Sequence, residues 1–450
     1  MKRLLAMTMI CSLALTSLIG CSSSDTTSTT EATAEATTET TDTGETVELT
    51  LWYTSTQLTD LELSLQEQFM EANPNITINN VIKEGDPGND FYTAVAAGNA
   101  PDVVTTSFTV MDQYMEAGIL EPMNQYFDAW EDKDAFDQVY LDQFSVDGNL
   151  YGLVTWSAAM YLGYNKALFE EAGVAEVPTT WDEAIESATL ISDLGADIVG
   201  YTTLTAEWTE WYFQYYVWQA GGDLTALNDD GTIELTFTDP AVIAAGEYYQ
   251  ELSSSGVLQS DLTLNYSDML DLFAQGKIGM MPFAGDWVSV MVGKGMNPDD
   301  IGLALFPAGP SGESVTTDIG QTMVINAASD EATKAAAWEY IAFMLSVDTL
   351  TQKAEDKVAS GAADPIIYAR NDFDSIAITG LPEEYEEVVE ASKGGRLEFA
   401  GKSIIGSYVD SAVQSILVDP NADVETEFAE AQSLAQTEVI DAYNAEILGE

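Results

Sequence analysis

One apolar stretch, Gly148 to Lys166, constrains the fold most strongly. It follows a turn at Asp147, is rich in β-forming residues, and is too short to span a membrane. We expect a buried strand that feeds a helix ending at Gly173. Because a complete α/β unit already precedes this stretch, we interpret it as the first crossing between two lobes. Trp156 and Ser157 would then face the cleft between the lobes.

Strands and helices alternate along the chain ahead of this stretch. Such alternation favours a mostly parallel sheet that is covered by helices on both faces. Asp60 is the expected N-cap of the first helix. The expected strands are 47–53, 76–82 and 101–106, and the expected helices are 61–72, 90–97 and 111–117.

Two later breaks complete the predicted architecture. We interpret the Pro/Gly-rich segment Pro307–Glu313 as the return crossing and 361–365 as the third crossing. The prediction is therefore an α/β protein of two lobes joined by a three-segment hinge, each lobe a mostly parallel sheet flanked by helices. Lobe 1 would comprise 47–154 and 314–363, and lobe 2 would comprise 155–313 and 364–450.

Composition excludes several function classes. The chain has no histidine, and its two cysteines, Cys11 and Cys21, precede the globular region. Ser-His-Asp and Cys-His catalysis and histidine-ligated metal sites are therefore absent, and we expect neither a metal nor a cofactor. The 75 acidic residues against 14 basic ones argue against binding to nucleic acid or to anionic lipid.

The N-terminal region has the pattern of a secretory leader. A basic start and an apolar run end in Leu18-Ile19-Gly20-Cys21, which resembles a bacterial lipobox. The resemblance implies a signal peptide over 1–20 and lipid attachment to Cys21. Residues 21–46 are almost entirely Ser, Thr, Ala, Asp and Glu, so we interpret them as a disordered tether.

Several motifs resemble the extracellular solute-binding proteins of ABC transporters, in the family that includes the maltose-binding protein. They are the segment Tyr151 to Lys166, the aromatic helix that runs to Gly221-Gly222, the loop Phe283 to Trp287, and Val324 to Ser329. Their order and spacing carry the resemblance. It implies a two-lobed fold of the type II periplasmic binding protein class and capture of a solute between the lobes.

A sugar site needs aromatic rings for stacking and fixed polar groups for hydrogen bonding, and strand ends are where open α/β sheets bind ligands. From this reasoning and the resemblance together, we predict twelve solute-binding residues. They are Trp52, Tyr53, Ser55, Trp156, Ser157, Trp208, Trp211, Tyr212, Asp286, Trp287, Gln321 and Tyr408.

The sequence leads to a functional hypothesis with two alternatives. We expect a monomeric, non-enzymatic binding lipoprotein, anchored on the extracellular face of the bacterial membrane, that delivers a mono- or oligosaccharide to an ABC permease. One alternative is the same scaffold carrying a solute other than a sugar. The other is a surface enzyme that processes glycosides, since acidic pairs are abundant in this chain.

Overall fold

The computed structural model describes residues 46–449 except 56, 85, 86, 229, 362 and 394. Glu45–Glu450 pack as one compact unit. No helix of the described part is both long and apolar enough to cross a membrane. The predicted signal peptide, the lipid site at Cys21 and the tether up to residue 45 lie outside the described residues.

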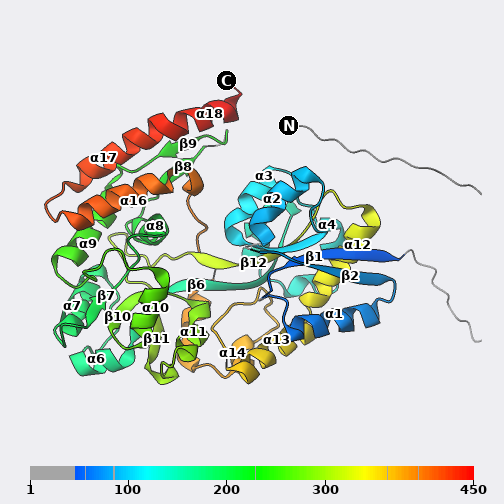
Figure 1. The fold of residues 1–450 in the computed structure, drawn as a ribbon, viewed down its shortest axis with the longest axis horizontal. Helices are drawn as coiled ribbons and strands as arrows, with labels where there is room; N and C mark the ends of the chain where they lie inside the picture. Colours follow the sequence, from blue (N-terminus) through cyan, green and yellow to red (C-terminus); the bar gives the residue numbers. More distant parts are fainter. Residues whose placement is uncertain are drawn as a thin grey trace, which may run out of the picture. The chain divides into compact units, whose positions relative to one another are not determined.

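One sheet of eight strands passes through both lobes in the order β2-β1-β3-β12-β6-β10-β7, with β11 also paired to β6 (Figure 1). The strands are β1 (Val47–Tyr53), β2 (Ile76–Ile82), β3 (Val103–Ser107), β6 (Leu153–Asn165), β7 (Val199–Tyr201), β10 (Ile278–Ala284), β11 (Ile301–Ala304) and β12 (Asp318–Ile325). Two small hairpins are β4 (Ser145–Val146) with β5 (Asn149–Leu150) and β8 (Thr225–Leu227) with β9 (Ile233–Leu235).

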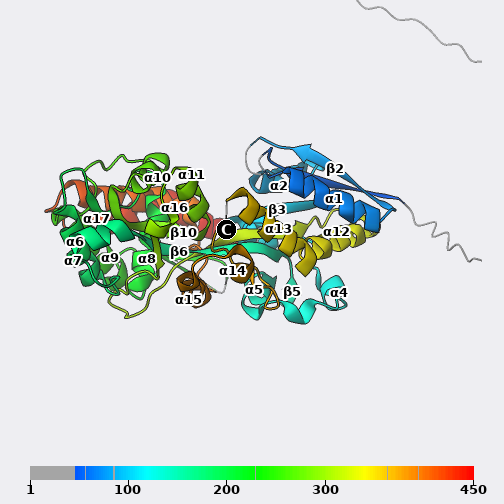
Figure 2. The same cartoon turned by 90° about the horizontal axis from the view of Figure 1, so that it is seen from below.

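Helices cover the sheet on both sides of the crossing strands (Figure 2). Before β6 lie α1 (Asp60–Ala72), α2 (Pro87–Ala97), η1 (Phe108–Val110), α3 (Met111–Glu116), α4 (Asn124–Phe127), η2 (Lys133–Ala135) and α5 (Gln138–Gln143). Between β6 and β12 lie α6 (Lys166–Ala172), α7 (Trp181–Ser192), α8 (Thr209–Gln219), α9 (Pro240–Ser254), α10 (Tyr266–Ala274), η3 (Gly285–Trp287), α11 (Val288–Gly293) and η4 (Pro298–Asp300). After β12 lie α12 (Glu331–Met344), α13 (Val347–Ser360), α14 (Ser375–Thr379), α15 (Glu383–Ser392), α16 (Lys402–Val418), α17 (Val424–Ala435), η5 (Gln436–Ile440) and α18 (Asp441–Leu448).

The first crossing lies within β6, as the sequence predicts. The first half of this 13-residue strand pairs with β12, and its second half pairs with β10 and β11. β1, β2 and β3 pair in parallel, as do β7 and β10, whereas β6 and β12 run antiparallel to their partners. The strands of each lobe are therefore mostly parallel. The antiparallel strands β6 and β12 are the two that pass between the lobes.

The return crossing lies later than predicted. Ala308 pairs with Thr180 and Ser311 donates to the carbonyl oxygen of Gln219, so the Pro/Gly-rich segment stays with elements that follow β6. The chain returns instead through β12, which pairs with β6 on one edge and β3 on the other. A Pro/Gly-rich break marks a turn, but here the chain passes from one lobe to the other within a paired strand. The exact lobe boundaries remain a prediction.

The third crossing lies close to its predicted position. Backbone hydrogen bonds of 2.7 and 2.6 Å join Ser157 of β6 to Ile367 in both directions. Asp364, three residues earlier, binds Ser289 of α11. Three chain segments therefore lie side by side between the lobes.

Local sequence explains several helix starts. Side chains that accept a hydrogen bond from a backbone N–H begin α1 at Thr59, α7 at Thr180, α12 at Asp330 and α13 at Ser346. Thr59 is the N-cap of α1 in place of the predicted Asp60, which is the first helical residue.

Candidate functional site

A cavity of about 660 Å³ opens beside the crossing strands. Its lining comes from β1, the start of α1, β6, η3, β12, α13 and the third crossing, so both lobes and the hinge contribute. Of the predicted solute-binding residues, it brings together Tyr53, Trp156, Asp286 and Gln321. A cavity with walls from two lobes is a natural place for a ligand.

A β-bulge shapes the floor of the cavity. Gln321 of β12 is opposite Trp156 of β6, but the next β12 residue pairs with Val154, so Thr155 is an extra residue in β6. The Thr155 hydroxyl donates to the carbonyl oxygen of Gln321 at 3.1 Å. Gly320 permits this close approach, since a Cβ there would lie 2.5 Å from the carbonyl oxygen of Trp156.

Trp156 and Gln321 hold each other in place at this bulge. The indole Nε1 of Trp156 donates to Oε1 of Gln321 at 3.2 Å. With its oxygen engaged, the amide keeps its N–H donors for another partner. The two crossing strands therefore supply an oriented donor next to an aromatic ring that is only partly buried.

A network fixes a carboxylate in the lobe 1 wall. Tyr53 and Tyr340 both donate to Oε1 of Glu62, at 2.8 and 3.2 Å, and the two tyrosine oxygens lie 2.8 Å apart. Lys353 of α13 lies 3.9 Å from Oε2 of Glu62. Burial raises the pKa of both tyrosines and lowers the pKa of the Lys353 ammonium, with Glu62 opposing that last effect. Glu62 is therefore a well-ordered acceptor at the cavity wall.

Two acidic side chains, Asp286 of lobe 2 and Asp364 of the hinge, also line the cavity. Burial raises the pKa of the Asp286 carboxyl at the end of β10. Burial and the charge of Asp286 raise the pKa of Asp364 to about 6, against the two hydrogen bonds from Ser289. Within the described part of the chain, no group of three or more Asp, Glu, Cys or His side chains could hold a metal ion. The cavity therefore offers hydrogen-bond acceptors and donors around one indole ring.

Two predicted residues point away because strand side chains alternate between faces. Trp156 and Tyr53 line the cavity, so their neighbours Ser157 and Trp52 lie on the opposite face. Ser157 is fully buried, and its hydroxyl donates to the carbonyl oxygen of Ile319 at 3.2 Å. Trp52 is buried beneath Lys83, whose Nζ lies 3.9 Å from the ring centroid. We correct both placements: Ser157 is a hinge residue and Trp52 a packing residue.

The aromatic helix α8 is core rather than cavity wall. Nine of its 11 residues are buried, Tyr212 among them, and a helix buried on all sides has no free face for a ligand. Trp287 is likewise only 8% exposed and packs against Phe283 and Tyr266. The prediction that Trp287 is a solute-binding residue is therefore corrected: its ring is packed in the core and does not line the cavity.

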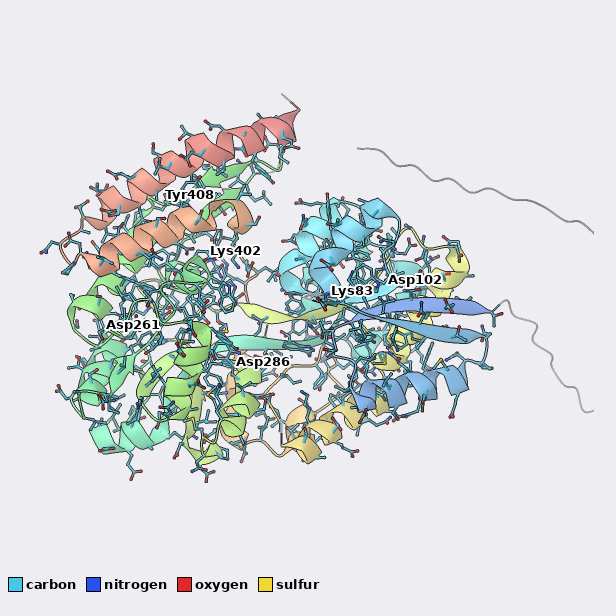
Figure 3. All side chains as sticks on the ribbon, viewed as in Figure 1. Lys83, Asp102, Asp261, Asp286, Lys402 and Tyr408 are labelled. Carbon is cyan, nitrogen blue, oxygen red and sulfur yellow. The ribbon has the colours of Figure 1, made fainter. Side chains whose placement is uncertain are left out.

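Four predicted residues lie outside the cavity. Ser55 is exposed after β1, and Trp211 is half-buried on α8 near Lys402. Trp208 is 51% exposed and adopts a left-handed backbone with φ of 52°. Tyr408 lies on α16, where it donates to Glu438 at 2.8 Å, and Figure 3 shows it well apart from Asp286. The hydroxyl of Tyr408, which the sequence predicts to bind solute, therefore bonds to a neighbouring helix instead.

Sequence reasoning predicts the third crossing but not that this crossing and α13 line the cavity. Lys353, Lys357 and Asp364 line the cavity, but no aromatic motif lies beside them in the sequence to mark a solute site. The packing of α13 against α1 and α12 brings the two lysines to the cavity, and the hydrogen bonds from Ser289 hold Asp364 there.

Comparison with known proteins places the chain in a family. The sequence profile described as bacterial extracellular solute-binding protein matches residues 55–349. A binding protein of Brucella abortus is 29% identical over 311 residues, which cover 68% of this chain and 73% of that protein. A maltotriose-binding protein of Pyrococcus abyssi is 24% identical over 388 residues, covering 84% of this chain and 79% of that protein.

The fold also matches solved structures. An ABC transporter solute-binding protein of Thermotoga lettingae, bound with alpha-D-tagatose, superposes with a TM-score of 0.69. It is 23% identical, and the match covers 87% of this chain and 99% of that chain. The sequence profile, the crossing strands and the shared fold agree, and this chain belongs to the bacterial extracellular solute-binding protein family.

Proposed function

We propose that this protein is the solute-binding component of an ABC importer and that its solute is a carbohydrate. The observation that carries the proposal is the cavity beside the crossing strands, where Trp156, Gln321 and Asp286 combine an aromatic ring with fixed polar groups. Sugars present an apolar ring face and a rim of hydroxyls, which this combination suits. The relatives named for maltotriose and solved with tagatose support the same solute class.

The mechanism is a shift in population between open and closed lobes. A solute that touches residues of both lobes, such as Glu62 and Asp286, binds the closed state better and so favours it. Motion at the three crossing segments requires changes in only a few backbone angles. The closed form would then be presented to the permease. We further propose that the protein acts as a monomer, anchored by lipid at Cys21 on the extracellular face of the membrane.

A surface glycosidase is the second candidate, because Asp286 and Asp364 place two carboxyls with raised pKa in one cavity. Both oxygens of Asp364, however, accept hydrogen bonds from Ser289, which suits a structural group better than a reacting one. We therefore propose a binding protein without enzymatic activity.

A thermal-shift screen with mono- and oligosaccharides tests the proposal, since a ligand of the folded state raises the melting temperature by mass action. At least one sugar should raise it and be recovered intact by chromatography. Cleavage of the sugar would favour the glycosidase, and a response to non-sugar solutes alone would overturn the carbohydrate assignment.

A further inference from the structure

Lys357 lacks an acidic partner in a chain where acids outnumber bases 75 to 14. In the described residues it makes no ion pair and no side-chain hydrogen bond. Lys277 is the other described lysine in this situation, while Lys133 donates to a carbonyl oxygen. Lys277 lies just ahead of β10, whereas Lys357 lines the cavity.

Asp286 is the matching acid on the other side of the cavity. Its Oδ1 is buried and has no hydrogen-bond partner among the described residues. A buried carboxylate oxygen without a donor is costly, so such an atom is expected to gain a partner in some state of the protein. Figure 3 shows Asp286 close to the crossing strands.

The two residues stand on elements of different lobes. Lys357 is on α13, which packs against α1 and α12. Asp286 is in η3, directly after β10. Asp364 also lies near both, but its two oxygens are engaged by Ser289 at 2.7 and 2.8 Å. Asp286 is therefore the acid with a free oxygen for Lys357.

We propose that Lys357 and Asp286 form an ion pair when the lobes close, and that this pair stabilises the closed state before any solute binds. Lys357, Asp286 and Asp364 line the same cavity. Burial raises the pKa of both carboxyls, and the charge of Lys357 opposes that rise at each of them. The inference rests on the proposed function only in requiring that the two lobes move relative to each other.

The expected effect is modest. A partly solvated ion pair contributes up to about 1 kcal/mol, which corresponds to roughly a two- to fivefold change in the ratio of closed to open molecules. Salt screens such a pair, so the ratio should fall as the ionic strength rises. These two properties define the experiment.

A distance measurement between spin labels on the two lobes tests the pair without solute. The sequence has only two cysteines, Cys11 and Cys21, and both are replaced by serine. The spin labels are then attached at Glu71→Cys on α1 and Asp299→Cys in η4. Both positions are exposed. The variants are Lys357→Gln, the matched control Lys277→Gln, and the charge swap Lys357→Asp with Asp286→Lys.

The parent and Lys277→Gln should show a short-distance population that shrinks at high salt. Lys357→Gln should lower that population about two- to fivefold and remove its salt dependence, and the charge swap should restore both. Equal populations in Lys357→Gln and the parent, or a parent with one long distance at low and high salt, would overturn the pair. Because no solute is added, this failure is distinct from a failure of the sugar screen.

Discussion

Asp364 of the third crossing accepts two hydrogen bonds from Ser289 of α11, one from its backbone N at 2.7 Å and one from its hydroxyl at 2.8 Å. The N-cap of α11, Trp287, makes no side-chain capping bond. α8 begins in the same way, at Trp208, and Asp410 of α16 accepts from the backbone N of Glu210 at 2.7 Å. Two helices that start at a tryptophan are thus capped by carboxylates from distant segments.

The first prediction concerns the pH dependence of stability. The pKa of Asp364 is about 6 in the folded protein, against an ordinary value of about 3.9. The folded state therefore binds the Asp364 proton more tightly than the unfolded state does. The stability that this proton contributes at low pH is lost as the pH rises from about 4 to about 6. The free energy of unfolding of Asp364→Asn, relative to the parent, should therefore rise by about 1–3 kcal/mol between these values.

Asp330→Asn is the matched control for this measurement. Asp330 caps α12, and the hydrogen bond from Thr333 lowers its pKa, so its stabilising contribution is lost as the pH falls. Relative to the parent, the free energy of unfolding of Asp364→Asn should rise as the pH rises, whereas that of Asp330→Asn should rise as the pH falls. Urea unfolding at several pH values measures both, and parallel curves for Asp364→Asn and the parent would contradict the assignment.

The second prediction concerns the strained backbone at Trp208. A bulky residue at φ of 52° costs roughly 1–2 kcal/mol, whereas asparagine tolerates this left-handed conformation. Trp208→Asn should therefore raise the free energy of unfolding by about 1 kcal/mol, since the ring is half exposed. Because Trp208 lies outside the cavity, the same variant should bind solute as the parent does. Lower stability of Trp208→Asn would show that its contact with Tyr266 outweighs the strain.

The third prediction follows from the burial of Trp287. Its ring packs against Phe283 and Tyr266, so Trp287→Ala should cost about 3–5 kcal/mol of stability. Trp208→Ala, at an exposed position, should cost far less in the same denaturant titration. Similar losses for the two variants would mean that the Trp287 ring is free in the cleft, as the sequence first suggested.

The fourth prediction concerns anchoring, which depends on residues outside the described part. Cys21→Ala should release the protein from membranes without changing the melting temperature of the folded region, because the tether joins the two. Fractionation of cells that express each form measures this. A variant that sediments with membranes as the parent does would exclude lipid attachment at Cys21.

The sequence predicts much of the fold because local signals are strong there. β1, β2 and β6 lie where β-forming runs predict them, and Thr180 caps α7 as its sequence pattern indicates. The return crossing through β12 was missed because strand pairing with both β3 and β6 is a long-range property.

The candidate site was harder to predict than the fold. Tryptophans at strand ends suit both a cleft and a core, and only packing shows that Trp52 and Trp287 are buried while Trp156 is not. The break at Gly361–Pro365 predicts a crossing but not a cavity wall, because Asp364 is held there by Ser289, 75 positions away.

Titration calorimetry with a sugar from the thermal-shift screen tests the central claim, that the cavity beside the crossing strands binds the solute. The parent should bind it, Gln321→Ala should raise the dissociation constant about tenfold, and Tyr408→Phe should bind as the parent does. Loss of affinity in Tyr408→Phe with unchanged affinity in Gln321→Ala would place the solute elsewhere and contradict the account.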